Sequence, residues 1–191
     1  INLGVKNLVN KVNQSDSKSV TQTFDSNNNL TCRKDEENRV TLYGYNTTNQ
    51  RTGMTEGMTG DCTAPVSVAG VTRTTTYQYL SPTLDLPTVV ESPSVASGTY
   101  KKRITLAYGD NRFPALPTGV TQSGYTPAGT SVFRTVTLSY NASGRVSSIN
   151  GPRTDVSDVT TLEYYECTTG GACGQMKKVT ASVTHLMTNR T

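Results

Sequence analysis

The stretch that decides the fold is Val136-Thr-Leu-Ser-Tyr140-Asn141-Ala-Ser-Gly144-Arg145-Val146-Ser-Ser-Ile149. It opens with alternating apolar and polar residues that end at an aromatic ring, passes through a polar turn and resumes with a second alternating segment. Asn and Gly are favoured in tight turns, and Gly144 supplies a backbone that accepts a positive φ. The stretch therefore predicts a β-hairpin.

Variations of this stretch recur along the chain. The other copies are Phe24–Thr31, Thr41–Arg51 and Arg103–Asp110. Their terminal aromatics align as Phe24, Tyr45, Tyr79, Tyr108, Tyr140 and Tyr164, at irregular intervals. Repetition of one theme indicates a repeat architecture, and the irregular spacing favours hairpins with loops of varying length over identical rungs. Such a chain is more often part of a wall or surface than a compact enzyme.

The composition fits an all-β chain with much exposed sheet. The 191 residues are 34% hydrophobic and 17% charged, with a mean hydropathy of −0.45. Thr, Val and Tyr favour strands, whereas Asn, Gly, Asp and Ser favour turns. The net charge is +4, but its basic residues cluster only at 101–103 and 177–178, so we expect no nucleic-acid partner. No stretch reaches the roughly 20 apolar residues of a membrane-spanning helix, and the opening Ile1 suggests an internal or processed piece.

The fold class expected is all-β, a curved antiparallel sheet of consecutive β-hairpins. Alternation puts Ile104, Leu106 and Tyr108 on one face of their strand, and Val136, Leu138 and Tyr140 on one face of theirs, which predicts one buried and one wet face. We expect one repeat domain over 1–191, with 1–20 as strands, a short helix or a loop, repeats over 21–180, a longer connection at Gly57–Val71 and a terminal strand or tail at 181–191. The predicted strands are Val20–Phe24, Leu30–Lys34, Arg39–Tyr45, Arg51–Glu56, Thr72–Leu80, Leu86–Glu91, Lys101–Tyr108, Pro117–Ser123, Ser131–Tyr140, Val146–Asn150, Thr160–Tyr165, Gln175–Thr180 and Ser182–Met187.

The four cysteines offer disulfides or a metal site. Cys167 and Cys173 flank a hairpin-turn signal, Gly170-Gly171, and two cysteines at the base of such a loop can approach disulfide distance. Cys32 and Cys62 are a second possible pair. Four thiolates could instead bind zinc, but neither pair has the C-x2-C spacing of a zinc site. Disulfides would point to an oxidising compartment.

Residues that carry catalysis are sparse. His185 is the single histidine and has no evident partner for a nucleophilic site. The acidic run at 35–37 is expected to be a solvated turn. Asp155 and Asp158 could form a calcium loop, although the spacing of an EF-hand is missing. We therefore expect no enzyme activity, no cofactor and no metal.

The segment Tyr140-Asn141-Ala142-Ser143-Gly144-Arg145-Val146 resembles the tyrosine–aspartate (YD) repeat of the Rhs family, which reads G-x3-R-Y-x-Y-D-x2-G-x-L/R. Phe24–Leu30 is similar with Phe for Tyr and Asn for Gly, and Arg39–Asn46 is similar to the first half. The copies are degenerate: Asn46 and Asn141 replace Asp, Leu80 follows Tyr79 and Gly109 follows Tyr108. The family's self-cleaving D-P-x-G segment is absent. The resemblance covers about residues 20–180.

The resemblance implies a structural role. Rhs and YD repeats form hairpins that join side by side into one long curved sheet, and in larger members this sheet encloses a toxic C-terminal domain. It implies a non-catalytic shell segment of a secreted or cell-surface protein, with the rest of its own shell and an enclosed effector as partners. The six aligned aromatics would stack between repeats, and the following Asp or Asn would cap the turn.

Two other functions stay open. An exposed Tyr/Asn/Thr face could bind carbohydrate or a cell surface, with Tyr43 and Tyr165 as the candidate contact residues because each lies beside or offset from an aligned aromatic. A hydrolase fragment would require two carboxylates that converge in a cleft.

Overall fold

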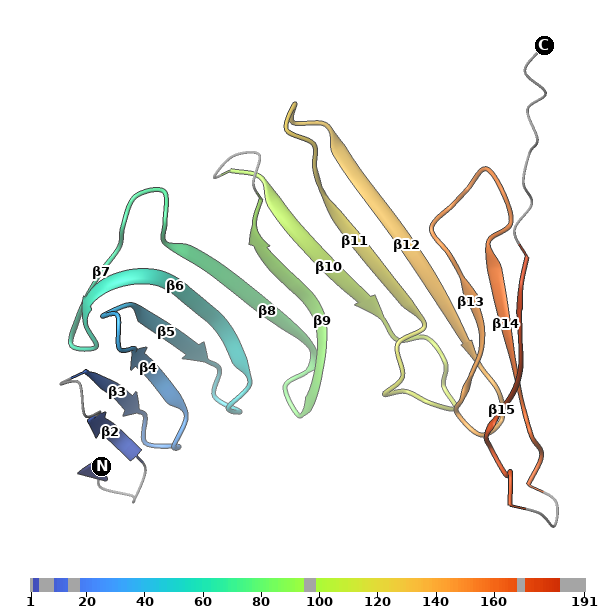
Figure 1. The fold of residues 1–191 in the computed structure, drawn as a ribbon, viewed down its shortest axis with the longest axis horizontal. Coiled ribbons are helices and arrows are strands. Elements are labelled where there is room, and N and C mark those ends of the chain that lie inside the picture. Colours follow the sequence, from blue (N-terminus) through green and yellow to red (C-terminus); the bar gives the residue numbers. More distant parts are fainter. Residues whose placement is uncertain (1, 4–8, 14–17, 95–98, 168–170, 183–191) are drawn as a thin grey trace. The chain divides into compact units, whose positions relative to one another are not determined.

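The computed structural model describes residues 2–3, 9–13, 18–94, 99–167 and 171–182, and all regular structure among them is β (Figure 1). The fold class predicted from the sequence is therefore confirmed. The chain falls into two compact units, residues 1–103 with 127–129, and residues 104–126 with 130–191. No helix in the described residues is long and apolar enough to span a membrane. The expectation of one repeat domain over the whole chain stays a prediction.

In the first unit each strand pairs antiparallel with the next, so that the sheet is a series of hairpins. The exception is the short strand β7, which pairs with β6 alone, while β8 lies against the first half of β6. The strands are β1 (Asn2–Leu3), β2 (Val9–Asn13), β3 (Ser19–Phe24), β4 (Leu30–Lys34), β5 (Val40–Tyr45), β6 (Arg51–Asp61), β7 (Ala64–Val66), β8 (Arg73–Ser81) and β9 (Leu84–Pro93).

The second unit repeats this plan. Its strands also pair antiparallel in chain order, and β12 has its long partner β11 on one side and β13 on the other. The strand β10 (Lys101–Ala107) carries the chain from the first unit into the second. The remaining strands are β11 (Gly119–Tyr125), β12 (Ser131–Tyr140), β13 (Val146–Asn150), β14 (Val159–Tyr164) and β15 (Met176–Ala181).

Within the described residues the strand predictions hold closely, with two main differences. The predicted strand Ser182–Met187 lies, beyond Ser182, outside the described residues. The predicted connection at Gly57–Val71 is wrong in its first part, because β6 continues to Asp61 and then folds back as β7. Gly57 and Gly60 adopt φ of 71° and 88°, which bends a strand without ending it. The ambiguous N-terminal region forms strands, and the described part of it pairs β1 with β2 and β2 with β3.

Each unit is a single layer, so its core is thin. Among the described residues only four hydrophobic side chains are buried: Cys32, Val40, Met58 and Tyr140. The predicted alternation is present in β12, where Val136 and Leu138 are half-buried and Tyr140 is buried, while Thr137 and Ser139 between them are exposed. The face of the sheet that carries the apolar side chains is therefore covered only in part, because in the described residues no second layer of structure packs on it.

Candidate functional site: repeat clamps and a groove at Tyr165

Four turns in the described residues share one hydrogen-bond pattern. In each, the first residue's N–H donates to the carbonyl of the fifth, and the fourth residue's N–H donates to the carbonyl of the first. The first side chain's oxygen accepts the N–H groups of the third and fifth residues at 2.8 to 3.1 Å. Aspartate and asparagine both offer this oxygen, which explains why they interchange here. The turns are 25–29, 35–39, 46–50 and 141–145.

The fourth residue of each turn has a left-handed backbone. Asn28, Asn38 and Asn49 have φ of 69°, 61° and 67°, and Gly144 has φ of 74°. This is a type I turn followed by a left-handed residue, a common three-residue hairpin loop. Asparagine accepts this conformation better than other residues with a Cβ, so Asn can take the place of Gly.

Tyrosine hydroxyls connect neighbouring strands beside these turns. Tyr45, which ends β5, donates to the carbonyl of Leu30, the first residue of β4, at 3.0 Å. The same arrangement joins Tyr79 to Arg51 at 2.9 Å and Tyr164 to Val146 at 2.8 Å. Each acceptor is the residue that directly follows a turn. We call this hydroxyl-to-carbonyl bond the repeat clamp, and it links one hairpin to the preceding one.

Tyr140 makes a fourth clamp and is the most deeply buried of these tyrosines. Its hydroxyl donates to the carbonyl of Pro117 at 2.7 Å, and its ring meets Phe113 edge-on with the ring centroids 6.4 Å apart. Burial raises the pKa of Tyr140, and likewise the pKa values of Tyr45 and Tyr79. The protonated hydroxyl that donates in the clamp is therefore maintained into alkaline solution.

Four of the six aromatics that the sequence predicts to align form these hydroxyl-to-carbonyl bonds. Tyr45, Tyr79, Tyr140 and Tyr164 form clamps. Phe24 occupies the same position at the end of β3 but has no hydroxyl to donate. The sixth aromatic of the set, Tyr108, lies directly after β10, and burial raises its pKa. Stacking of these rings from repeat to repeat stays a prediction.

The fifth residue of a turn makes the contact that sequence reasoning missed. The Asn29 amide donates to Asn49 Oδ1 at 2.8 Å, which joins the first turn to the third. Gln50 is 7% exposed, and its amide donates to the carbonyls of Ser81 and Leu84 at 2.9 and 2.7 Å. A buried amide with two carbonyl partners ties this turn to the next one along the sheet.

Asp35 corrects the expectation of a solvated acidic turn at 35–37. It is 9% exposed and caps its own turn, while Glu36 is half-buried and Glu37 is exposed. Burial alone would raise the pKa of Asp35, but the hydrogen bonds and the charge of Arg39 outweigh it and lower this pKa. The Arg39 Nε atom lies 2.8 Å from Asp35 Oδ2.

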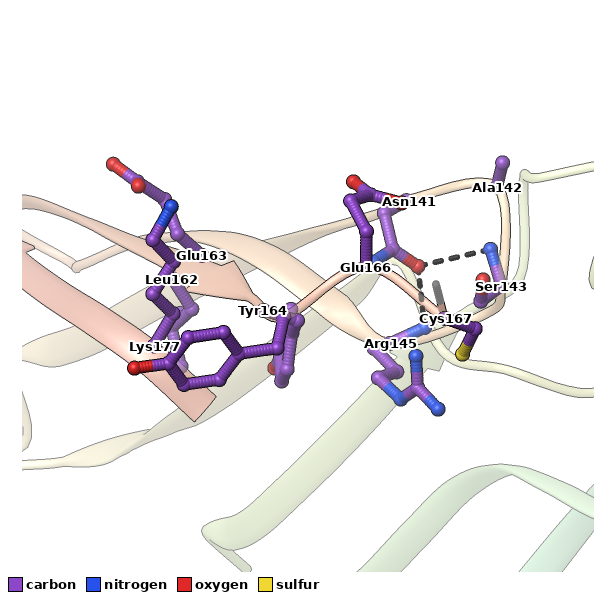
Figure 2. Close-up of a pocket in the computed structure, with 11 residues that line it drawn as sticks. Asn141, Ala142, Ser143, Arg145, Leu162, Glu163, Tyr164, Glu166, Cys167 and Lys177 are labelled. Carbon is purple, nitrogen blue, oxygen red and sulfur yellow. Dashed lines mark hydrogen bonds between the residues drawn. The ribbon is translucent and has the colours of Figure 1, made fainter. Parts of the chain in front are cut away.

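A groove of about 670 Å³ lies in the second unit, between the turn at 141–145 and the β14–β15 hairpin (Figure 2). Tyr165, a candidate contact residue, lines it and is 45% exposed. Lys177 lies 6.0 Å from the centre of the Tyr165 ring, and Arg145 lies 5.7 Å from the centre of the Tyr164 ring. Glu163 and Glu166 also line the groove, and Figure 2 shows Glu163 at the left of the view and Glu166 nearer its middle. Tyr43, the other candidate, is half-buried on β5 opposite Met54.

Both cysteine pairs form disulfides. Cys167 and Cys173 are joined with their Cα atoms 4.4 Å apart, and Cys32 and Cys62 are joined with their Cα atoms 5.7 Å apart. In the described residues no group of three or more His, Cys, Asp or Glu side chains is arranged to hold a metal ion. Asp155 instead pairs with Arg153, with Nη2 to Oδ2 at 2.7 Å. His185 lies outside the described residues.

The comparisons with known proteins find solved structures of low similarity. No family of known proteins and no curated protein matches the sequence. The crystal structure of TcdB2-TccC3 is similar with a TM-score of 0.32 and 12% identity, over 85% of this chain and 12% of that one. The crystal structure of TcdB2-TccC3-Cdc42 is similar with a TM-score of 0.28 and 15% identity, over 79% of this chain and 10% of that one. The chain spans about a tenth of the length of these proteins.

Proposed function

We propose that this chain is a non-catalytic wall segment of a secreted or cell-surface protein of the Rhs/YD-repeat type, which encloses or presents a C-terminal effector. The observation that supports it is the repeat clamp, formed by a capped turn and a tyrosine that bonds the hairpin before it. The clamp fastens each repeat to its neighbours and assembles no shared reactive centre. Residues whose contacts only join hairpins side by side have the effect of extending the sheet.

The half-covered face favours enclosure over a solitary sheet. A single-layered hairpin array does not bury its apolar face by itself, and apolar side chains such as Val132 and Leu84 are 46% and 48% exposed. Such surface is covered when a longer array of repeats surrounds another domain. The partners proposed are therefore the remaining repeats of the parent protein and the effector that they enclose.

Limited proteolysis of the parent protein tests this function. The C-terminal domain of the intact parent should be digested at least about tenfold more slowly than the same domain expressed alone, since a protease acts on exposed, locally opened chain. Equal digestion rates would exclude enclosure. A parent reading frame without further repeats on either side would exclude the wall itself.

A second candidate function rests on the groove. It holds an exposed aromatic ring, an amide and charges of both signs, which are the groups that bind sugar rings and hydroxyls. Binding to a glycan array that is lost in Tyr165→Ala but kept in Tyr43→Ala would support carbohydrate recognition at the groove. Binding that is unchanged in both variants, or absent from the native chain, would contradict it.

A further inference from the structure

The two disulfides have opposite surroundings. Cys32 is 2% exposed and packs with Val40 and Met58 in the buried cluster of the first unit, and the partly buried Leu42 and Cys62 pack against this cluster. Cys167 and Cys173 are both exposed, beside the end of the β14–β15 hairpin. An attacking thiol must approach a sulfur atom directly, so the second pair is open to exchange at both cysteines, whereas the first is shielded at Cys32 and partly shielded at Cys62.

Two cationic side chains line the groove beside the exposed pair, together with the carboxylates of Glu163 and Glu166. Cys167 lines the groove together with Arg145 and Lys177. The Arg145 guanidinium packs against Gly174, the residue after Cys173, so closely that a side chain at Gly174 would collide with it. Nearby cations stabilise a thiolate, both as the group that leaves a disulfide and as the product that remains.

We propose that Cys167–Cys173 is a redox-reactive site that exchanges with small thiols of the glutathione class, while Cys32–Cys62 is a structural bridge. A thiolate attacks Sγ of Cys167, a new S–S bond forms, the Cys167–Cys173 bond breaks, and Cys173 leaves as a thiolate beside Arg145. A second thiolate attacks the mixed disulfide, releases Cys167 as a thiolate and leaves as the oxidised thiol dimer. Two thiols are oxidised and one cystine is reduced to two cysteines.

The exchange alters the groove itself. Cys167 is part of its wall, so reduction places a thiolate, and the intermediate places a bulky adduct, in the groove that Arg145 and Lys177 also line. The site is thus a modification site whose state changes the charge of the groove. This inference does not depend on the wall function, because it concerns the cysteines and their neighbours alone.

A titration with glutathione tests the proposal. The oxidised chain is equilibrated with buffers of increasing ratio of reduced to oxidised glutathione, quenched with acid and alkylated, and the alkylated peptides are measured by mass spectrometry. We expect Cys167 and Cys173 to be alkylated at a ratio at least tenfold lower than Cys32 and Cys62. Opening of both pairs together, or of Cys32–Cys62 first, would overturn the assignment.

Two charge variants test the role of the cations. Arg145→Gln should slow the reaction with glutathione at pH 7 several-fold, whereas Arg134→Gln, which removes an exposed arginine from β12, should leave it unchanged. Lys177→Gln is the second variant, because Arg145 also belongs to a hairpin turn and its loss could disturb folding. Rates in Arg145→Gln and Lys177→Gln equal to that of Arg134→Gln would overturn the electrostatic part of the proposal.

Discussion

At the scale of single residues, the hydroxyl of Tyr140 accounts for the choice of tyrosine over phenylalanine. The ring alone would fill the same space, but the carbonyl of Pro117 would lose its donor at 2.7 Å. Tyr140→Phe should therefore lower the free energy of unfolding by about 1 kcal/mol, as measured by urea denaturation. Tyr165→Phe is the control, because that side chain is exposed and lies outside the clamps. An equal loss in both variants would contradict a special role of the clamp.

Asp35 provides a residue-scale prediction about pH. Its pKa is lower in the folded chain than in the unfolded one, so the stability it contributes is present above its unfolded pKa near 4 and is lost as the pH falls through the lower folded value. Asp35→Asn should keep the turn, because Asn46 and Asn141 form the same turn, but it should remove this part of the pH dependence. We expect the stabilities of the two proteins, measured by denaturant unfolding from pH 6 to 2, to converge in acid. A constant difference across this range would contradict the assignment.

At the scale of elements, the sequence predicted what depends on neighbouring residues. The strands β4, β12 and β13 have their predicted bounds, because alternation and turn residues act locally. Gln50 could not be found in this way, since its two acceptors lie 31 and 34 residues away along the chain. The acidic run at 35–37 is typical of a solvated turn, so the sequence pattern does not show that Asp35 caps its turn and is buried. The groove at Tyr165 depends on how the turn at 141–145 lies against the β14–β15 hairpin, and the alternation of apolar and polar residues along the sequence does not specify this contact.

The disulfides make an element-scale prediction about which strands they stabilise. Cys32 and Cys62 lie 30 residues apart and join β4 to the end of β6 across β5, so the double variant to alanine should lose about 3–4 kcal/mol from loop entropy. Replacing Cys167 and Cys173, only 6 residues apart, should cost about 2–3 kcal/mol. Amide hydrogen exchange should speed up in β4–β6 for the first variant and in β14–β15 for the second. Faster exchange spread evenly over both units would contradict this local action.

At the scale of the whole molecule, a sheet built by linking repeats has free edges. In the described part of the chain β15 pairs with β14 alone, and all six of its residues are exposed. Unpaired N–H and C=O groups along such an edge recruit another strand, so the chain should self-associate as its concentration rises. Val179→Lys, which places a charge on this edge at a residue 53% exposed, should shift the association to several-fold higher concentration in analytical ultracentrifugation. The matched control is Val71→Lys, because Val71 is also 53% exposed but lies in a turn. If both variants weaken association equally, general charge repulsion and not strand pairing governs the association. A chain that stays monomeric at every concentration would contradict the open sheet edge that a wall segment requires.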